Sequence, residues 1–253
     1  LRGRLYRQGL QQLERVLQLE PRHLSAALSL ADLYSAAGKP ARSQEILQTV
    51  RQRAADFGLN PTNEFDVIRA EVNTLFATGK RDAATDALAN ALNRSSIPAS
   101  FRAAAIDLYL RNGLAAPALP LIEQVLAENP EDLNALGQRG YACMQVNRFA
   151  DARTSLDRAL DLNPKSNIFR LNRAITLQHL KQFDDAQRDC EIILKEAPNT
   201  YQALFVLGEI AVEKKDTSAA ARYFERCLNL VPVSSPDYKA IKARLDDLGS
   251  AKK

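Results

Sequence analysis

The chain has 253 residues, of which 46% are hydrophobic and 25% are charged, so it can bury a large core and lacks the composition of a disordered chain. The 34 Lys and Arg and 30 Asp and Glu are mixed along the chain without a basic run, which argues against nucleic acid as a partner. No stretch approaches the roughly 18 to 20 apolar residues that cross a bilayer, so we predict no membrane insertion by this segment.

The sequence repeats itself at an interval of 34 residues. "FADARTSLDRALDLNP" at 149–164 returns as "FDDAQRDCEIILKEAP" at 183–198, with the aromatic residue, Asp, Ala and Pro in the same places. A fixed period of this length is typical of repeat proteins and decides the fold class before any single residue is interpreted.

Taken in chain order, the elements begin with a half repeat at 4–22 that matches only the second helix of a unit. The full repeats are predicted at 24–57, 65–98, 99–132, 133–166, 167–200 and 201–234. Each contains two stripes of apolar residues spaced by three and four, which predicts two amphipathic helices joined by a turn. The segment "GLNPTNE" at 58–64 is predicted to be a loop inserted after the first full repeat.

One more helix is predicted at 236–249, after the last full repeat. Its outward face carries Lys239, Lys242, Asp246 and Asp247, and we interpret the helix as a solvating cap for the open end of the array.

Small residues and prolines recur in register with the repeat. Gly140, Ala174 and Gly208 share one place in the first helices. The second helices carry Ala84, Ala118, Ala152, Ala186 and Ala220, and the units close with Pro21, Pro130, Pro164, Pro198 and Pro232. Small side chains let two helices approach closely, and a proline just past a helix end stops its continuation.

This pattern resembles the tetratricopeptide repeat, a 34-residue helix-turn-helix unit, over nearly the whole chain. Two departures are the absence of the family's Trp and Ser96 where a closing proline is usual. The resemblance implies an all-α, right-handed superhelical solenoid of antiparallel helix pairs, forming one domain over 1–253. It also implies a concave face lined mainly by the first helices, where ligands are usually held.

The resemblance also suggests one ion pair. Arg173 and Asp189 lie at places where the family often has these residue types, and we predict that they pair between the two helices of their repeat. The alternative is that both side chains are exposed and never meet.

Catalytic chemistry finds little support in the sequence. His23 and His179 lack metal-binding spacing, and there is no glycine-rich phosphate loop or nucleophile elbow. Cys143, Cys190 and Cys227 are too few for a disulfide framework or zinc site and fall on positions that pack between helices. We therefore predict no enzyme activity, no metal and no cofactor.

The predicted functional surface is a partner groove in the last three repeats. It comprises Asn134, Gln138, Tyr141, Gln145, Ile168, Leu171, Asn172, Ile175, His179, Gln202, Phe205 and Glu209. Exposed apolar residues rimmed by Asn, Gln and Glu are typical of a groove for a peptide or partner helix. The alternative is that several of these side chains point into the neighbouring repeat, since a few degrees of helix rotation would bury them.

A secondary polar groove is predicted from Arg69, Asn73 and Arg111, which could hold an acidic group. A subset of the family grips a C-terminal carboxylate with basic and Asn side chains on successive first helices. Ala104 stands where that pattern needs Asn, and Asn134 and Gln138 stand where it needs the basic pair. These departures argue against the binding of chaperone tails.

The leading hypothesis is a non-enzymatic protein-protein interaction scaffold that binds a peptide or partner segment, within a larger assembly or secretion protein. Abundant Ala, Arg and Gln favour a bacterial source, in the cytoplasm or the periplasm. Two alternatives remain: an arm of a larger enzyme or membrane-anchored envelope assembly factor, and a self-associating module that dimerises through its open N-terminal repeat.

Overall fold

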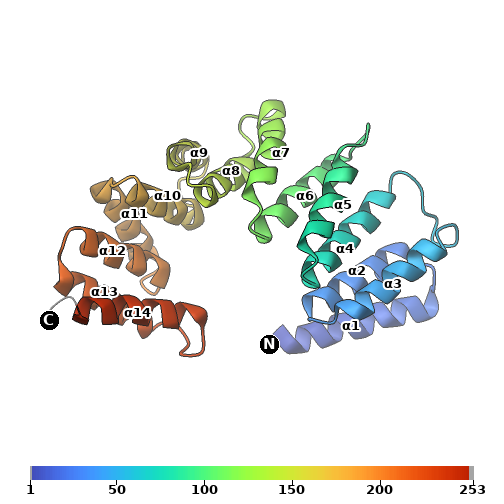
Figure 1. The fold of residues 1–253 in the computed structure, drawn as a ribbon, viewed down its shortest axis with the longest axis horizontal. Helices are drawn as coiled ribbons and strands as arrows, with labels where there is room; N and C mark the ends of the chain where they lie inside the picture. Colours follow the sequence, from blue (N-terminus) through green and yellow to red (C-terminus); the bar gives the residue numbers. More distant parts are fainter. Residues whose placement is uncertain (1, 251–253) are drawn as a thin grey trace. The chain divides into compact units, whose positions relative to one another are not determined.

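The computed structural model describes residues 2–250, and within this range the chain is α-helical without a β-strand (Figure 1). This confirms the all-α class. The first residue and the last three of the predicted 1–253 domain lie outside the described residues. The chain divides into two compact units, one ending at Leu114 and the other beginning at Ala115.

Unit 1 contains six helices within its described residues, 2–114. They are α1 (Arg2–Leu19), α2 (Leu24–Ala36), α3 (Pro40–Gln52), α4 (Glu64–Ala77), α5 (Arg81–Leu92) and α6 (Ala99–Arg111). Helix α2 packs on α3 and α4 packs on α5, while α1 and α4 both contact α2. The core between them is built from fully or nearly fully buried aliphatic side chains such as Leu28, Leu47 and Val67.

Unit 2 contains the remaining helices. They are α7 (Ala115–Glu128), α8 (Leu133–Gln145), α9 (Phe149–Leu162), α10 (Asn167–His179), α11 (Phe183–Glu196), α12 (Tyr201–Glu213), α13 (Thr217–Leu228) and α14 (Pro236–Ser250). Successive pairs pack together, α8 on α9, α10 on α11 and α12 on α13, and α14 packs on α13. Each first helix also contacts the next first helix, α8 with α10 and α10 with α12, so their outward faces form one continuous surface.

The two helices of a pair meet at residues with almost no side chain. Ala84, Ala152, Ala186 and Ala220 are all 0% exposed. In the first helices, a Cβ added to Gly140 would lie 2.6 Å from Leu156 Cγ, and one added to Gly208 would lie 2.5 Å from Phe224 Cε1. The close approach predicted from the small residues is therefore present, because nothing larger fits between these helices.

Six turns between consecutive helices share one backbone conformation. Their left-handed residues are Gly38, Gly79, Gly113, Asn147, Lys181 and Lys215, with φ between 60° and 74°. In each turn two backbone N–H groups donate hydrogen bonds to carbonyls in the last turn of the preceding helix. Lys181 N–H donates to the Gln178 carbonyl at 3.0 Å, and Gln182 N–H donates to the Leu177 carbonyl at 2.9 Å. These bonds satisfy the last carbonyls of the helix. Glycine adopts this conformation without strain, whereas lysine does not.

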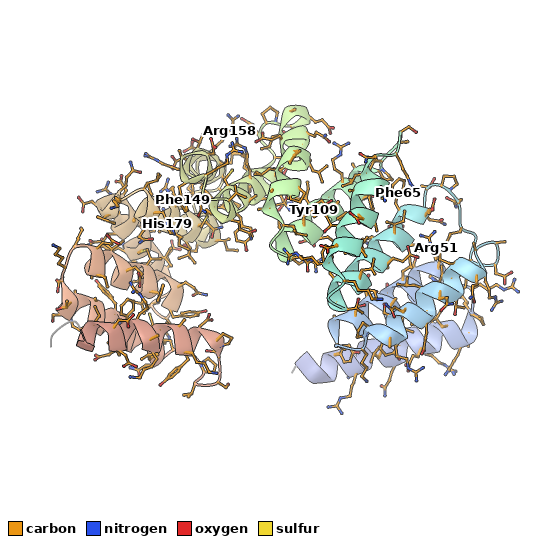
Figure 2. All side chains as sticks on the ribbon, viewed as in Figure 1. Arg51, Phe65, Tyr109, Phe149, Arg158 and His179 are labelled. Carbon is orange, nitrogen blue, oxygen red and sulfur yellow. The ribbon has the colours of Figure 1, made fainter. Side chains whose placement is uncertain are left out.

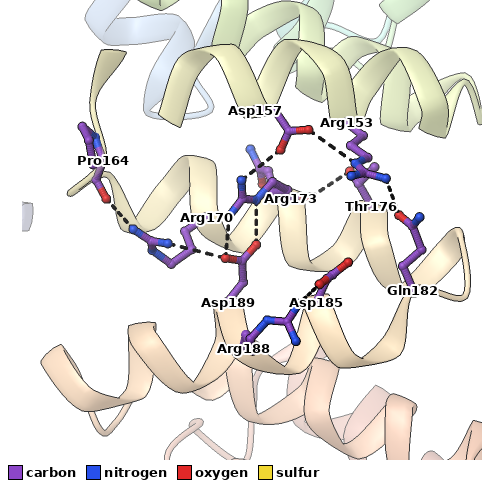
Figure 3. Close-up of polar contacts among 11 residues, drawn as sticks. Arg153, Asp157, Pro164, Arg170, Arg173, Thr176, Gln182, Asp185, Arg188 and Asp189 are labelled. Atoms are coloured by element: carbon purple, nitrogen blue, oxygen red, sulfur yellow. Dashed lines mark hydrogen bonds and ion pairs between the residues drawn. The ribbon is translucent and has the colours of Figure 1, made fainter. Parts of the chain in front are cut away.

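The predicted pairing of Arg173 with Asp189 is confirmed (Figure 3). Arg173 Nε and Nη2 each donate to an Asp189 carboxylate oxygen at 2.8 Å, and Arg173 Nη1 donates to Asp157 at 2.9 Å. Arg170 lies on the other side of the same carboxylate, 3.5 Å away. Because the Asp189 side chain is only 4% exposed, its charge depends on these guanidinium groups, which tie α9, α10 and α11 together.

The three cysteines are free thiols, and each is 0% exposed. Burial raises the pKa of Cys190 from 9.0 to about 12 and that of Cys227 to about 11. The thiolate, which is the nucleophile and the metal ligand, is thus disfavoured at neutral pH. The prediction that these residues pack as small hydrophobic side chains is confirmed.

We expect Lys181→Gly to stabilise unit 2. The substitution removes a left-handed strain of about 1 to 2 kcal/mol, while the extra freedom of glycine in the unfolded chain costs about 0.5 to 1 kcal/mol. The free energy of unfolding in urea should rise by up to about 1.5 kcal/mol. The control Lys239→Gly, in the exposed body of α14, should lower it. A loss of stability in both variants would contradict the assignment of strain to the turn.

We expect Gly208→Ala to destabilise the chain, although alanine is the better helix former. The new methyl would overlap the buried ring of Phe224, and overpacking of this kind costs about 1 to 3 kcal/mol. Gly249→Ala is the matched control, because nothing lies within 4 Å of its added Cβ. Urea denaturation should show a lower midpoint for the first variant and an equal or higher midpoint for the second; equal gains in both would rule out close contact at Gly208.

The buried thiols should make stability fall in alkali. The folded-state pKa of Cys190 lies above its unfolded value, so its contribution is complete below pH 9.0 and is lost as the pH rises towards about 12. Urea denaturation at pH 8 and pH 10.5 is the measurement. The loss of unfolding free energy between these values should be smaller in Cys190→Ala than in the wild type, and identical losses would contradict the burial of a protonated thiol.

Candidate partner-binding groove

A pocket with a volume of about 520 Å³ lies in unit 2, between α10, α12 and α14. Its lining residues are Ile175, Gln178, His179, Tyr201, Gln202, Phe205, Val206, Glu209, Asp237, Ala240, Ile241 and Arg244. On each helix they are spaced by three and four, which places them on one face. The volume falls within the range of ligand pockets, roughly 300 to 1,000 Å³.

The pocket brings together a subset of the predicted groove residues. Ile175, His179, Gln202, Phe205 and Glu209 line it, and they come from the facing sides of α10 and α12. Gln202 and His179 are exposed, while Phe205 is partly buried, with its ring centroid 5.5 Å from that of Phe224. These five residues are the part of the predicted groove that lines a concave pocket.

The other predicted groove residues lie outside the pocket. These are Asn134, Gln138, Tyr141 and Gln145 on α8, and Ile168, Leu171 and Asn172 on α10. None of them is fully buried; Ile168 is 72% exposed and Tyr141 is 43% exposed. Leu171 packs partly against the core between α10, α11 and α12. Ile168 is thus exposed, as expected for a groove residue, whereas Leu171 packs partly into the core, as expected if the side chain points into the neighbouring repeat.

One wall of the pocket was missing from the sequence-based prediction. The site is completed by Asp237, Ala240, Ile241 and Arg244 of α14, a helix that the sequence predicts only as a solvating cap. A signal was present, because α14 begins at Pro236, one residue later than one full period after the start of α12. The helix thus occupies the place of the first helix of a further repeat, where groove residues are expected.

Both carboxylates of the pocket accept hydrogen bonds from side chains that line it, Glu209 from a guanidinium and Asp237 from a phenol. Arg244 Nε and Nη2 donate to the two carboxylate oxygens of Glu209, both at 2.7 Å, and this contact raises the pKa of Arg244. Tyr201 Oη donates to Asp237 at 2.7 Å, and this hydrogen bond raises the pKa of Tyr201. Both contacts hold α14 against α12. The remaining lining of the pocket is formed largely by apolar side chains.

His179 stacks on the ring of Phe149 from α9, with 4.3 Å between ring centroids and 9° between their planes (Figure 2). The contact fixes the imidazole at the edge of the pocket. It gives this histidine a structural partner that does not depend on a metal or a substrate.

The secondary polar groove in unit 1 carries charges that are already neutralised. Arg69 Nη1 donates to Asp32 at 2.8 Å and Asn73 Nδ2 donates to the same carboxylate at 3.0 Å. Arg111 pairs with Asp107 at 2.7 Å. An acidic ligand would have to displace these carboxylates, so the structure supports ligand binding at this surface less well than at the pocket in unit 2.

Within residues 2–250, no group of three or more His, Cys, Asp or Glu side chains is placed to hold a metal ion. In the same range, no helix combines the length and the apolar character needed to span a membrane.

Comparison with known proteins supports the repeat assignment. Two sequence models, each described as tetratricopeptide repeat, match residues 5–58 and 109–175 and residues 171–235, together more than two thirds of the chain. The structure is similar to that of a tetratricopeptide repeat protein from Parabacteroides merdae. The TM-score is 0.56 at 19% identity, covering 94% of this chain and 99% of the other, a likeness of fold alone.

Two curated relatives match part of the chain. The E3 ubiquitin-protein ligase CHIP of Arabidopsis thaliana is 25% identical over 117 residues, covering 46% of this chain and 42% of that protein. The putative cellulose synthase operon protein C of Escherichia coli O157:H7 is 27% identical over 173 residues, covering 63% of this chain and 15% of that protein. The chain spans less than half the length of these relatives. From the repeat matches and the fold, the chain belongs to the tetratricopeptide repeat family.

Proposed function

We propose that this chain is a non-enzymatic scaffold that binds a segment of a partner protein along the first-helix face of unit 2. The main support for the proposal is the pocket between α10, α12 and α14. In it, five predicted groove residues lie beside further apolar side chains, Val206 and Ile241. The exposed side chains of Ile168 and Tyr141 extend this face along α10 and α8. Apolar surface rimmed by polar side chains is the usual composition of a binding interface.

We further propose that the segment acts within a larger bacterial assembly or secretion protein. Its similarity to the putative cellulose synthase operon protein C supports this, because the matched segment is only 15% of that much longer chain. The fold of the scaffold is shared by many proteins, so the side chains on the first-helix face must decide which partner binds.

The test is capture of partners by immobilised protein, with matched variants. Ile168→Asp and Tyr141→Asp place a charge on the proposed face at side chains that are exposed, so folding should be retained. Leu171 and Phe205 suit the test less well, because both pack partly against the core. We expect partner capture to fall at least tenfold in the two variants, as charge burial in an interface does.

Val233→Asp is the control, since Val233 is 71% exposed and lies outside α8, α10 and α12. It should capture partners as the wild type does, and circular dichroism should show the same helix content in all four proteins. Equal capture by the wild type, Ile168→Asp and Tyr141→Asp would refute the proposed face.

A further inference from the structure

We propose that the pocket between α10, α12 and α14 receives an uncharged aliphatic or aromatic side chain of the partner polypeptide and discriminates against anionic groups. The inference rests on the proposed function and specifies the chemistry of the partner at this site. Three features carry it: the walls, the pairing of the charges and the polar groups at the rim.

The walls are apolar on three sides. Ile175 comes from α10, Phe205 and Val206 from α12, and Ile241 from α14. Val206 is 6% exposed and Ile241 is 2% exposed, so both are held by the core and present a fixed surface. A side chain that enters gains hydrophobic free energy of roughly 25 cal/mol for each Å² of apolar area buried.

The charges at the pocket oppose an anion. Two carboxylates, Glu209 and Asp237, and one guanidinium, Arg244, line it, so the carboxylates outnumber the cation. Arg244 already donates to both oxygens of Glu209. An incoming carboxylate would have to displace Glu209 while approaching Asp237, and would lose its hydration on entry.

A cation is also a poor fit. Glu209 is satisfied by Arg244 and Asp237 accepts from Tyr201. A charged amine would exchange water for the walls formed by Ile175 and Phe205. Glu209 is already paired, so Asp237 alone would offset this desolvation cost, and only in part. The pocket therefore favours a neutral side chain.

The rim supplies uncharged hydrogen-bonding groups. Gln178 and Gln202 line the pocket on α10 and α12, and the Gln202 side chain is exposed. A primary amide both donates and accepts, which suits the N–H and C=O groups of a peptide backbone on either side of the anchor. The arrangement matches an apolar side chain carried on a polypeptide.

The experiment uses three probes that differ by one property each. N-acetyl-phenylalaninamide has the neutral anchor, N-acetyl-phenylalanine adds one carboxylate at pH 7, and N-acetyl-alaninamide removes the ring. Titration of the full chain, followed by the amide NMR signals of Gln202 and Ala240, measures binding. We expect the neutral phenylalanine probe to shift both signals, the anionic probe to bind at least fivefold more weakly, and the alanine probe to bind more weakly still.

A pair of variants on one helix locates the binding. Ala240 and Ala243 are both exposed on α14, but only Ala240 lines the pocket. Ala240→Phe should fill the pocket and abolish the response at Gln202, whereas Ala243→Phe should respond as the wild type does. Circular dichroism checks that both remain folded.

The proposal is overturned if the anionic probe binds as tightly as the neutral one, if Ala240→Phe leaves binding intact, or if none of the probes shifts the pocket signals. Failure here is separable from failure of the proposed function. If Ile168→Asp loses partner capture and none of the probes binds, the proposed scaffold function is supported and only the proposed selectivity of the pocket is refuted. Undiminished capture in both Ile168→Asp and Tyr141→Asp would refute the proposed scaffold face, whatever the probes do.

Discussion

The contact between the two helices of each pair is the constraint on which the remaining structure depends. The second helices contribute alanines with no exposed surface, and the first helices contribute Gly140 and Gly208, where even a methyl group would overlap a buried neighbour. Contacts this close fix the rotation of each first helix about its axis. The rotation in turn decides which side chains face outward, so the surface available to a partner is set by packing on the opposite side of the helix.

The sequence alone predicted well those features that depend on local spacing. The all-α class, the helix pairs and the Arg173–Asp189 pair follow from periodicity and from a family pattern in which fixed positions face each other. Features that depend on contacts between repeats were not predictable in this way. Asp32 lies 37 residues from Arg69, and nothing in the spacing indicates that their charges cancel. Likewise, Ile168 and Leu171 lie three residues apart on one stripe, yet Ile168 is exposed and Leu171 packs partly against the core.

Charge pairing gives the two units a common surface property. Asp32 neutralises Arg69 in unit 1, and Arg244 neutralises Glu209 in unit 2. In both cases the pair joins separate helices, so its removal would expose an uncompensated charge and also release one helix from its neighbour. Electrostatic attraction to a charged ligand is weakened by the same pairs that align the helices. For the proposed partner, the apolar walls and the glutamine side chains of the pocket are then the remaining means of recognition.

The last residue matched by the repeat models is 235, and α14 begins at Pro236. One wall of the pocket thus stands just outside the segment that the repeat pattern constrains. Ala240 is exposed and can change without disturbing the glycine and alanine contacts that hold the helix pairs together. Two proteins with equally regular repeats could therefore differ in what they bind through this single helix, and repeat similarity would be a poor guide to a shared partner.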